Sequence, residues 1–191
     1  MRLFVALEIP SSVRENLAAA IQEMRSVAPQ VKWVRPENLH VTLKFLGETP
    51  SDKLASLRAA LFAVRSPRPV ELRFHGVGFF PNDKHPRVFW AGLTSSANLA
   101  PLARTIDQAT ATLGFPLETR PFTPHLTLAR FDPPGMSPAL LAAAAQNASR
   151  EFGTLDTASF QLIQSKTKST GAEYTTLHSF SFAAEAERPN A

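Results

Sequence analysis

Two copies of one short motif contain the residues whose chemistry is most specific. His40 and Thr42 stand two positions apart, and His125 and Thr127 repeat that spacing 85 residues later, in a chain with five histidines. An imidazole can take up or release a proton near neutral pH, and a threonine hydroxyl can donate a hydrogen bond to a phosphate oxygen. The two motifs predict in-line displacement at phosphorus. One histidine would remove a proton from water and the other would protonate the departing oxygen, while the threonines bind the phosphate.

Both motifs have the composition of β-strands, which determines where their side chains point. Alternate residues of an extended chain lie on the same face. Each histidine therefore shares a face with the threonine two residues on, while apolar neighbours such as Val41 and Leu126 point into a core. One His-x-Thr-Leu sequence is typical of an ordinary half-buried strand. A second copy favours a catalytic pair in one cleft, whereas His75, His85 and His178 have no such counterpart.

Similarity at the same offset extends beyond the motifs and predicts an internal repeat. The further matches, without an insertion, are Arg2–Ala6 with Arg87–Ala91, Leu17 with Leu102, and Ile21 with Ile106. The halves, about 1–85 and 86–183, share the order strand, helix, strand, strand, helix, strand. We expect a single domain over residues 1–191 of the α/β (α+β) class. It would be bilobal, with two duplicated antiparallel-rich sheet modules, outer helices, a central cleft and a pseudo-two-fold axis.

Local patterns assign the individual elements. Apolar residues at helical spacing follow a capping box formed by Ser12 and Glu15, and recur after Ser51 and from Leu99. A fourth helix is expected at Ser137–Asn147. Strands are expected at Met1–Ile9, Val31–Arg35, Val41–Leu46, Val70–Val77, Arg87–Leu93, Leu126–Phe131, Thr157–Gln164 and Tyr174–Phe182. Residues 184–191 are polar enough to form a frayed tail.

Composition narrows the possible chemistry. The chain has no cysteine, which excludes thiolate nucleophiles and cysteine-ligated zinc, and the motifs contain no acidic residue to complete a metal site. It also has no serine-hydrolase elbow, no nucleotide-triphosphate loop and no zinc-binding His-Glu-x-x-His sequence. We therefore expect a reaction without cofactor or metal. The net charge of +4 suits an anionic partner.

The expected setting follows from what the chain does not contain. No apolar run approaches the length of a membrane span. The apolar start, Met1–Ile9, is interrupted by Glu8 and has no small-residue cleavage site, so it indicates a strand rather than a signal peptide. We expect a cytoplasmic monomer with no membrane partner.

Taken with these motifs, the sequence resembles the 2H phosphoesterase superfamily. The resemblance is to its RNA 2′,3′-cyclic phosphodiesterase branch, historically called 2′-5′ RNA ligases. It covers nearly the whole chain and is carried by Arg2–Leu7, Trp33–Gly47, Trp90–Leu93 and Arg120–Arg130. It implies hydrolysis of a terminal RNA 2′,3′-cyclic phosphate, as on tRNA fragments, to a 2′-phosphomonoester, with weak reversible 2′-5′ ligation. It also implies that His40 donates a proton to the leaving 3′ oxygen and that His125 accepts one from water. From the residues alone, either histidine fits either role.

Four further residues are candidates for contact with RNA. Lys44 has the strand parity of His40, and the alternative is a solvated strand cation. Arg130 follows the second motif with the opposite parity, so it needs a bend or a strand end to reach phosphate. Phe122 and Trp33 could stack on a base, as in single-strand binders, or pack in the core.

Two other functions fit the same residues. The same histidines could act on a different 2′-5′ or cyclic phosphoester, with unchanged chemistry. A non-catalytic module that binds RNA ends would also keep the cleft. Turnover that is lost in His40→Ala and His125→Ala, with phosphate binding retained, distinguishes an enzyme from such a module.

Overall fold

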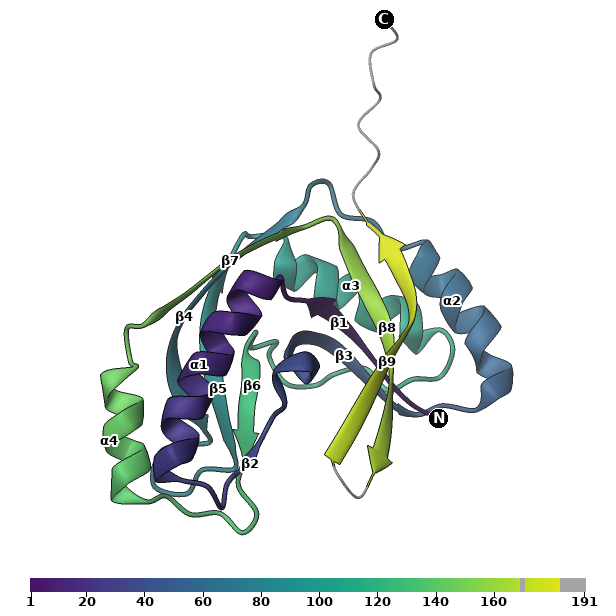
Figure 1. Ribbon diagram of the computed structural model, residues 1–191. Helices are drawn as coiled ribbons and strands as arrows, with labels where there is room; N and C mark the ends of the chain where they lie inside the picture. Colours follow the sequence, from purple (N-terminus) through teal and green to yellow (C-terminus); the bar gives the residue numbers. More distant parts are fainter. Residues whose placement is uncertain (169–170, 183–191) are drawn as a thin grey trace, which may run out of the picture.

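The strands of the chain pair into one antiparallel sheet, with two pairs of helices beside it (Figure 1). The computed structural model describes residues 1–168 and 171–182. Over these residues the strands are β1 (Arg2–Glu8), β2 (Lys32–Trp33), β3 (His40–Glu48), β4 (Val70–Phe80), β5 (Val88–Ser95), β6 (Leu126–Arg130), β7 (Glu151–Thr157), β8 (Ser159–Lys168) and β9 (Gly171–Ser181). The helices are α1 (Ser11–Val27), α2 (Leu54–Phe62), α3 (Leu99–Ala111) and α4 (Pro138–Gln146), with 3-10 turns at Pro36–Asn38 and Ser51–Lys53.

The sheet has two lobes that meet at β3 and β6. The strand order is β7-β4-β5-β6-β3-β1-β8-β9, and β2 pairs with β6. Neighbours within a lobe pair over several residues, but β3 and β6 share one register pair, Val41 with Leu126. The expected bilobal α/β architecture is confirmed, and the two motif strands lie side by side at its centre.

That central pair marks the pseudo-two-fold axis. Val41 and Leu126 are equivalent residues of the two motifs, 85 positions apart. When equivalent residues of antiparallel strands face each other, a two-fold rotation exchanges the strands. The histidine and the threonine of each motif flank this pair on its two sides. The duplication therefore brings both motifs to one point.

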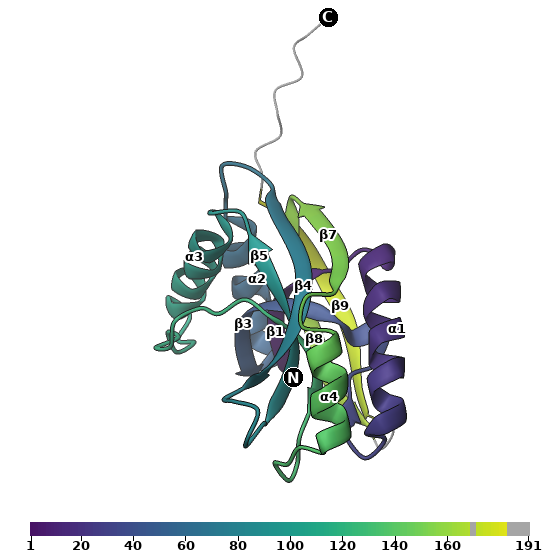
Figure 2. The ribbon, with the colours of Figure 1, turned by 90° about the vertical axis from the view of Figure 1, so that its left-hand side faces the viewer.

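Apolar helix faces complete the core. Val13, Leu17, Ile21 and Met24 recur at helical spacing along α1 and are buried. Helix α1 packs against β7 and α4 against α1, while α2 packs against β9 and α3 against β3. The strands therefore lie between the two helix pairs in Figure 2. One cluster of buried apolar residues, the main core, runs through both lobes. In the described part of the chain, no helix is long and apolar enough to cross a membrane.

The lobes and the halves of the repeat are different segments. One lobe combines β1 and β3 of the first half with β8 and β9 of the second. The other lobe combines β2 and β4 of the first half with β5, β6 and β7 of the second. Because each half contributes its last strands to the other lobe, neither half contains a complete lobe. We propose on this basis that the two halves fold as one domain.

The first strands of the halves align one residue away from the expected match. Phe4 faces Phe45 in the pairing of β1 with β3, and Val88 faces Arg130 in the pairing of β5 with β6. Phe4 is therefore equivalent to Val88, at an offset of 84 rather than 85. The insertion-free match of Phe4 with Phe89 is wrong, because Phe89 lies in the main core and Phe4 outside it.

Two local expectations are also corrected. The capping box is absent, because α1 begins at Ser11, after Pro10, and has no side-chain cap. A single strand at Thr157–Gln164 was expected, but β7 ends at Thr157 and β8 begins at Ser159. Strand β7 escaped prediction because Gly153, with φ of 116°, interrupts its alternation. The expected tail, 184–191, lies outside the described residues.

Candidate active site

Strand β3 and the segment that begins with His125 and continues as β6 carry the two motifs on the side of the sheet away from the main core. This side is named the open face, and it is defined by the motif side chains His40, Thr42, His125 and Thr127. All four are half-buried, while the residues that alternate with them are buried in the main core. The strands thus separate the apolar and the reactive side chains, as their alternation predicts.

Each imidazole is held by the main-chain carbonyl two residues before it. The Nδ1 of His40 lies 2.7 Å from the carbonyl oxygen of Asn38, and the Nδ1 of His125 lies 2.8 Å from that of Thr123. A carbonyl oxygen accepts and cannot donate, so this contact assigns the proton to Nδ1 in both rings. Nε2 is then the free nitrogen of each neutral imidazole. The repeat presents the same nitrogen twice for proton transfer.

Aromatic side chains enclose His40. Its ring centroid lies 4.7 Å from that of Phe4 and 5.4 Å from that of Tyr174. Burial raises the pKa of the Tyr174 hydroxyl, which the charges of Arg130 and Arg2 lower in part. Tyr174 is therefore a neutral hydroxyl beside the imidazole, able to donate a hydrogen bond.

The environment of His40 also favours its neutral form. Burial lowers the pKa of His40, and the hydrogen bond to the Asn38 carbonyl opposes that shift. The charges of Arg130 and His125 lower the pKa of His40 further. The pairing of Val41 with Leu126 places the second motif and Arg130 on the strand next to that of His40.

His125 has a different aromatic neighbour. Its ring meets Phe80 edge-on at 5.1 Å, and Phe80 lies 5.2 Å from Trp90. The Trp90 indole covers Gly78, where an added Cβ would lie 2.2 Å from the ring. A residue without a side chain is therefore required at position 78 for Trp90 to adopt this place.

Two equivalent β-bulges change which residues reach the open face. Leu43 has no partner residue in the pairing of β1 with β3, and Leu128, 85 residues later, has none in the pairing of β5 with β6. A bulge reverses the alternation beyond it, so Phe45 and Arg130 point to the same side as the histidines. Phe45 is 61% exposed, and Arg130 is also exposed. The bulge at Leu128 is therefore the bend that the Arg130 side chain needs to reach a phosphate on the open face.

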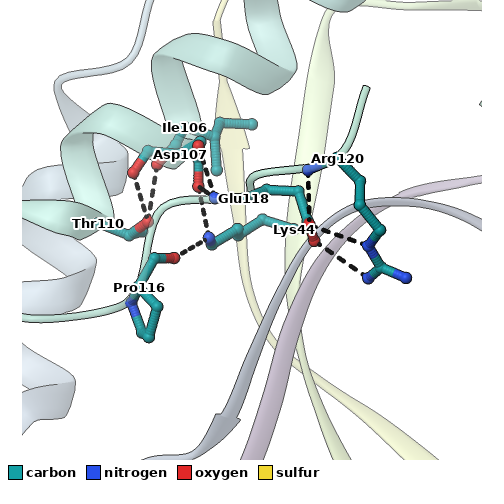
Figure 3. Close-up of polar contacts among 7 residues, drawn as sticks. All are labelled: Lys44, Ile106, Asp107, Thr110, Pro116, Glu118 and Arg120. Carbon is teal, nitrogen blue, oxygen red and sulfur yellow. Dashed lines mark hydrogen bonds and ion pairs between the residues drawn. The ribbon is translucent and has the colours of Figure 1, made fainter. Parts of the chain in front are cut away.

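The first of these bulges turns Lys44 away from the open face. The buried side chain of Lys44 forms an ion pair with the half-buried Asp107 of α3 and donates to the carbonyl oxygen of Pro116 (Figure 3). Asp107 also accepts from the main-chain nitrogen of Glu118. The expectation that Lys44 contacts RNA is wrong, because the reversed alternation places its side chain against α3. Its repeat equivalent, Ala129, is buried as well.

Trp33 and Phe122 pack against the main core. The Nε1 of Trp33 donates to the carbonyl oxygen of Ala28 at 3.0 Å, and its ring meets Phe89 edge-on at 5.9 Å. Of the two alternatives considered for these rings, packing in the core is the one that the contacts support.

Sequence reasoning missed the aromatic residues around the histidines. They are Phe4, Phe45, Phe80, Trp90 and Tyr174. For Phe4 a signal was available, because Leu3 and Val5 occupy the core and alternation sends Phe4 the other way. For Phe45 the signal was hidden by the bulge. Within residues 1–168 and 171–182, no group of three or more His, Asp or Glu side chains is placed to hold a metal ion.

The fold and the paired site define a phosphoesterase of the two-histidine type. Residues 7–90 and 93–174 match the model of the family described as LigT like phosphoesterase. The chain belongs to this family, and the resemblance found in the sequence is confirmed.

Known relatives match nearly the whole chain. It is 37% identical to the RNA 2′,3′-cyclic phosphodiesterase of Archaeoglobus fulgidus over 94% of this chain and 99% of that protein. It is 34% identical to the protein of the same name from Thermus thermophilus, over 100% and 95% of the two chains. A crystal structure of a Thermus thermophilus protein matches with a TM-score of 0.78 and 33% identity, over 97% of this chain and 100% of that one. Escherichia coli LigT complexed with 3′-AMP matches with a TM-score of 0.73 and 26% identity, over 96% and 98%.

Proposed function

We propose that this protein is an RNA 2′,3′-cyclic phosphodiesterase that opens the terminal ring to a 2′-phosphomonoester by two-histidine acid/base catalysis, without a metal or cofactor. The observation that carries the proposal is the matched pair of imidazoles, each with Nδ1 bound to a main-chain carbonyl and Nε2 free. The names of the relatives that span nearly the whole chain support the same activity. The expected setting, a cytoplasmic monomer acting on RNA ends such as those of tRNA fragments, stays a prediction.

The proposed reaction divides two proton transfers between the histidines. Neutral His125 accepts a proton from water at Nε2 while the water oxygen attacks phosphorus. The bond from phosphorus to the 3′ oxygen breaks, and that oxygen takes a proton from protonated His40. The products are a 2′-phosphate and a 3′-hydroxyl, with the protonation states of the histidines exchanged. An RNA 5′-hydroxyl in place of water would form a 2′-5′ linkage, which accounts for weak ligation.

Three further side chains are proposed to hold the phosphate. The hydroxyls of Thr42 and Thr127 would donate to non-bridging oxygens, where negative charge accumulates as phosphorus becomes pentacoordinate. Arg130 adds a positive charge on the same face, close enough to influence His40. Hydrogen bonds to charged groups are stronger than neutral ones, so these contacts would stabilise the transition state.

The assignment of acid and base follows the family pattern, with His40 as donor and His125 as acceptor. In the free protein the lowered pKa of His40 favours neutral imidazole, which by itself suits a base. A bound phosphate anion beside the ring acts in the opposite direction and favours the protonated form. His40 would then be protonated in the complex and positioned to give its proton to the leaving oxygen.

Phe45 offers a surface for the nucleoside. Thr42 and Phe45 face Ala6 and Phe4, two steps apart on β1, which corresponds to about 7 Å. That span is comparable to the distance from a nucleotide phosphate to its base. Stacking on an exposed ring tolerates any base, so we propose that Phe45 supports the base of the terminal nucleotide.

The test is to incubate the purified protein, in the presence of chelator, with a short RNA that ends in a 2′,3′-cyclic phosphate. Formation of a terminal 2′-phosphate is the expected result. A 2′-5′ dinucleotide tested in parallel identifies the alternative substrate if it is cleaved faster. Binding of the RNA without turnover would indicate the end-binding module, and a strict need for a divalent ion would refute the proposed mechanism.

A further inference from the structure

Asn38 is a buried polar residue that joins His40 to β9. It is 8% exposed and ends the 3-10 turn before β3. Its main-chain carbonyl accepts from Nδ1 of His40 at 2.7 Å, and its side-chain Nδ2 donates to the carbonyl oxygen of Ala172 at 2.8 Å. Strand β9 also supplies Tyr174, whose ring lies 5.4 Å from that of His40. One residue therefore contacts the imidazole and anchors the strand beside it.

Among the described residues, no comparable anchor holds the other motif. Thr123, the residue equivalent to Asn38, is exposed. Its main-chain carbonyl holds Nδ1 of His125, but its hydroxyl bonds locally to the carbonyl oxygen of Pro121 at 3.5 Å. The tie to a distant strand is thus specific to the His40 side and is not needed for the motif strand itself.

We propose that Asn38 is a positioning residue for His40: its side-chain amide fixes the carbonyl that holds Nδ1, so that Nε2 remains the reactive nitrogen. The inference rests on the proposed function, in which His40 moves a proton. A buried amide that loses its partner is costly, so the contact with Ala172 restrains the turn. Without that restraint, the carbonyl of Asn38 can move away from the imidazole and the other tautomer becomes available.

The titratable and charged groups around His40 all come from residues other than Asn38, so the effect of the Asn38 contact on His40 can be measured separately. Arg130 and His125 influence the ring from the β6 side, Tyr174 contacts it from β9, and Glu8 is its partner on β1. Shortening Asn38 to alanine removes none of these groups. Because the carbonyl contact raises the pKa of His40, weakening it lowers that pKa.

The experiment compares Asn38→Ala with a matched variant, Asn147→Ala. Asn147 is 6% exposed and donates to the carbonyl oxygen of Ala143 at 2.8 Å, at the end of α4. Nitrogen-15 NMR of labelled histidine measures the tautomer and the titration midpoint of His40. We expect Asn38→Ala to lower that midpoint and reduce the Nδ1-protonated tautomer. We also expect kcat/KM to fall about ten- to hundredfold, as when the partner that orients a functional histidine is lost. Asn147→Ala should lower stability without changing His40.

The stability and histidine NMR measurements on the same variants also include the result that would overturn the proposal. If Asn38→Ala loses stability like Asn147→Ala but keeps the tautomer and midpoint of His40, Asn38 is a packing residue and the proposal fails. Asn38→Ser, with a smaller cavity, provides the same readout if the alanine variant does not fold. If the wild-type protein does not turn over the cyclic phosphate but Asn38→Ala still changes the His40 signal, the positioning role is supported and the proposed function is refuted. The failure of one proposal can therefore be distinguished from the failure of the other.

Discussion

Strands β3 and β6 have the same backbone plan but different surroundings. Each places a histidine with Nδ1 on the carbonyl two residues earlier, and each has a bulge one residue after the threonine. Phe4 and Tyr174 enclose His40, whose pKa is lowered by burial, whereas His125 has Phe80 beside it. The duplication supplies equal geometry, and the different neighbours suit the two different proton transfers that we propose for these identical side chains.

The same contrast continues beyond the bulges. Phe45 and Arg130 are equivalent and both reach the open face, one with an aromatic ring and the other with a charge. Lys44 and Ala129 are equivalent and both are buried. A terminal nucleotide is itself asymmetric, with an anionic phosphate and a flat base. A symmetric framework that carries different side chains on its two halves suits such a ligand.

The largest expected effect is the loss of turnover when either of the two equivalent histidines is replaced. We expect His40→Ala and His125→Ala each to reduce kcat by about 10²- to 10⁴-fold, the usual contribution of a general acid or base. Because the two residues act in one step, the double variant should be little worse than either single variant. Steady-state kinetics on cyclic-phosphate RNA measures all three. Full additivity of the two losses would contradict joint action.

The next effect concerns stability rather than turnover. Lys44→Met leaves the half-buried Asp107 without its ion-pair partner, and we expect a loss of about 3 kcal/mol in the free energy of unfolding, the lower end of the range for a buried pair. The control is Lys32→Met, which breaks the exposed pair with Asp132 and should leave the free energy of unfolding nearly unchanged, because solvent screens exposed charges. Denaturant unfolding measures both. If Lys44→Met instead kept full stability and weakened RNA binding, the assignment of Lys44 to the helix side would be wrong.

A smaller effect sharpens the contrast between Phe45 and Arg130. Phe45→Ala should weaken substrate binding by about 1–3 kcal/mol, the value of one stacked base, and appear mainly in KM. Phe62→Ala on α2 removes a ring that is similarly exposed, at 66%, and should change nothing. A substrate that lacks the terminal base should be insensitive to both substitutions. Equal loss on that substrate would exclude stacking on Phe45.

The smallest effect is a displacement of the pH profile. Arg130 lowers the pKa of His40, so Arg130→Gln should raise it. The limb of the bell-shaped kcat/KM profile that reports His40 should therefore move to higher pH, in addition to any loss of phosphate binding. Histidine NMR titration of the free variant provides an independent check. A shift to lower pH would mean that Arg130 does not act on His40 as described.

Much of the site could be predicted because it depends on alternation and repetition. Two His-x-Thr sequences at one offset were sufficient to place both histidines on one face, and the structure pairs Val41 with Leu126 between them. The bilobal fold followed from the same repeat. The exchange of strands between lobes could not be predicted, since pairing partners far apart in sequence leave no local pattern.

The errors share one physical cause, which is irregularity within strands. Parity arguments fail beyond a bulge, and the bulges at Leu43 and Leu128 moved Lys44 off the open face and Arg130 onto it. Neither bulge has a Gly or Pro beside it in the sequence to indicate its position. Burial of Trp33 was equally hidden, because an aromatic residue in a short strand has the same local sequence whether it packs or stacks.

The central claim is that the two halves perform different proton transfers with the same framework. The most direct test uses a 2′,3′-cyclic phosphate in which sulfur replaces the bridging 3′ oxygen, because a thiolate leaves without needing a proton. We predict that this substrate restores turnover in His40→Ala but not in His125→Ala. Equal deficits of the two variants on both substrates would contradict the division of roles, and restoration in His125→Ala alone would reverse it.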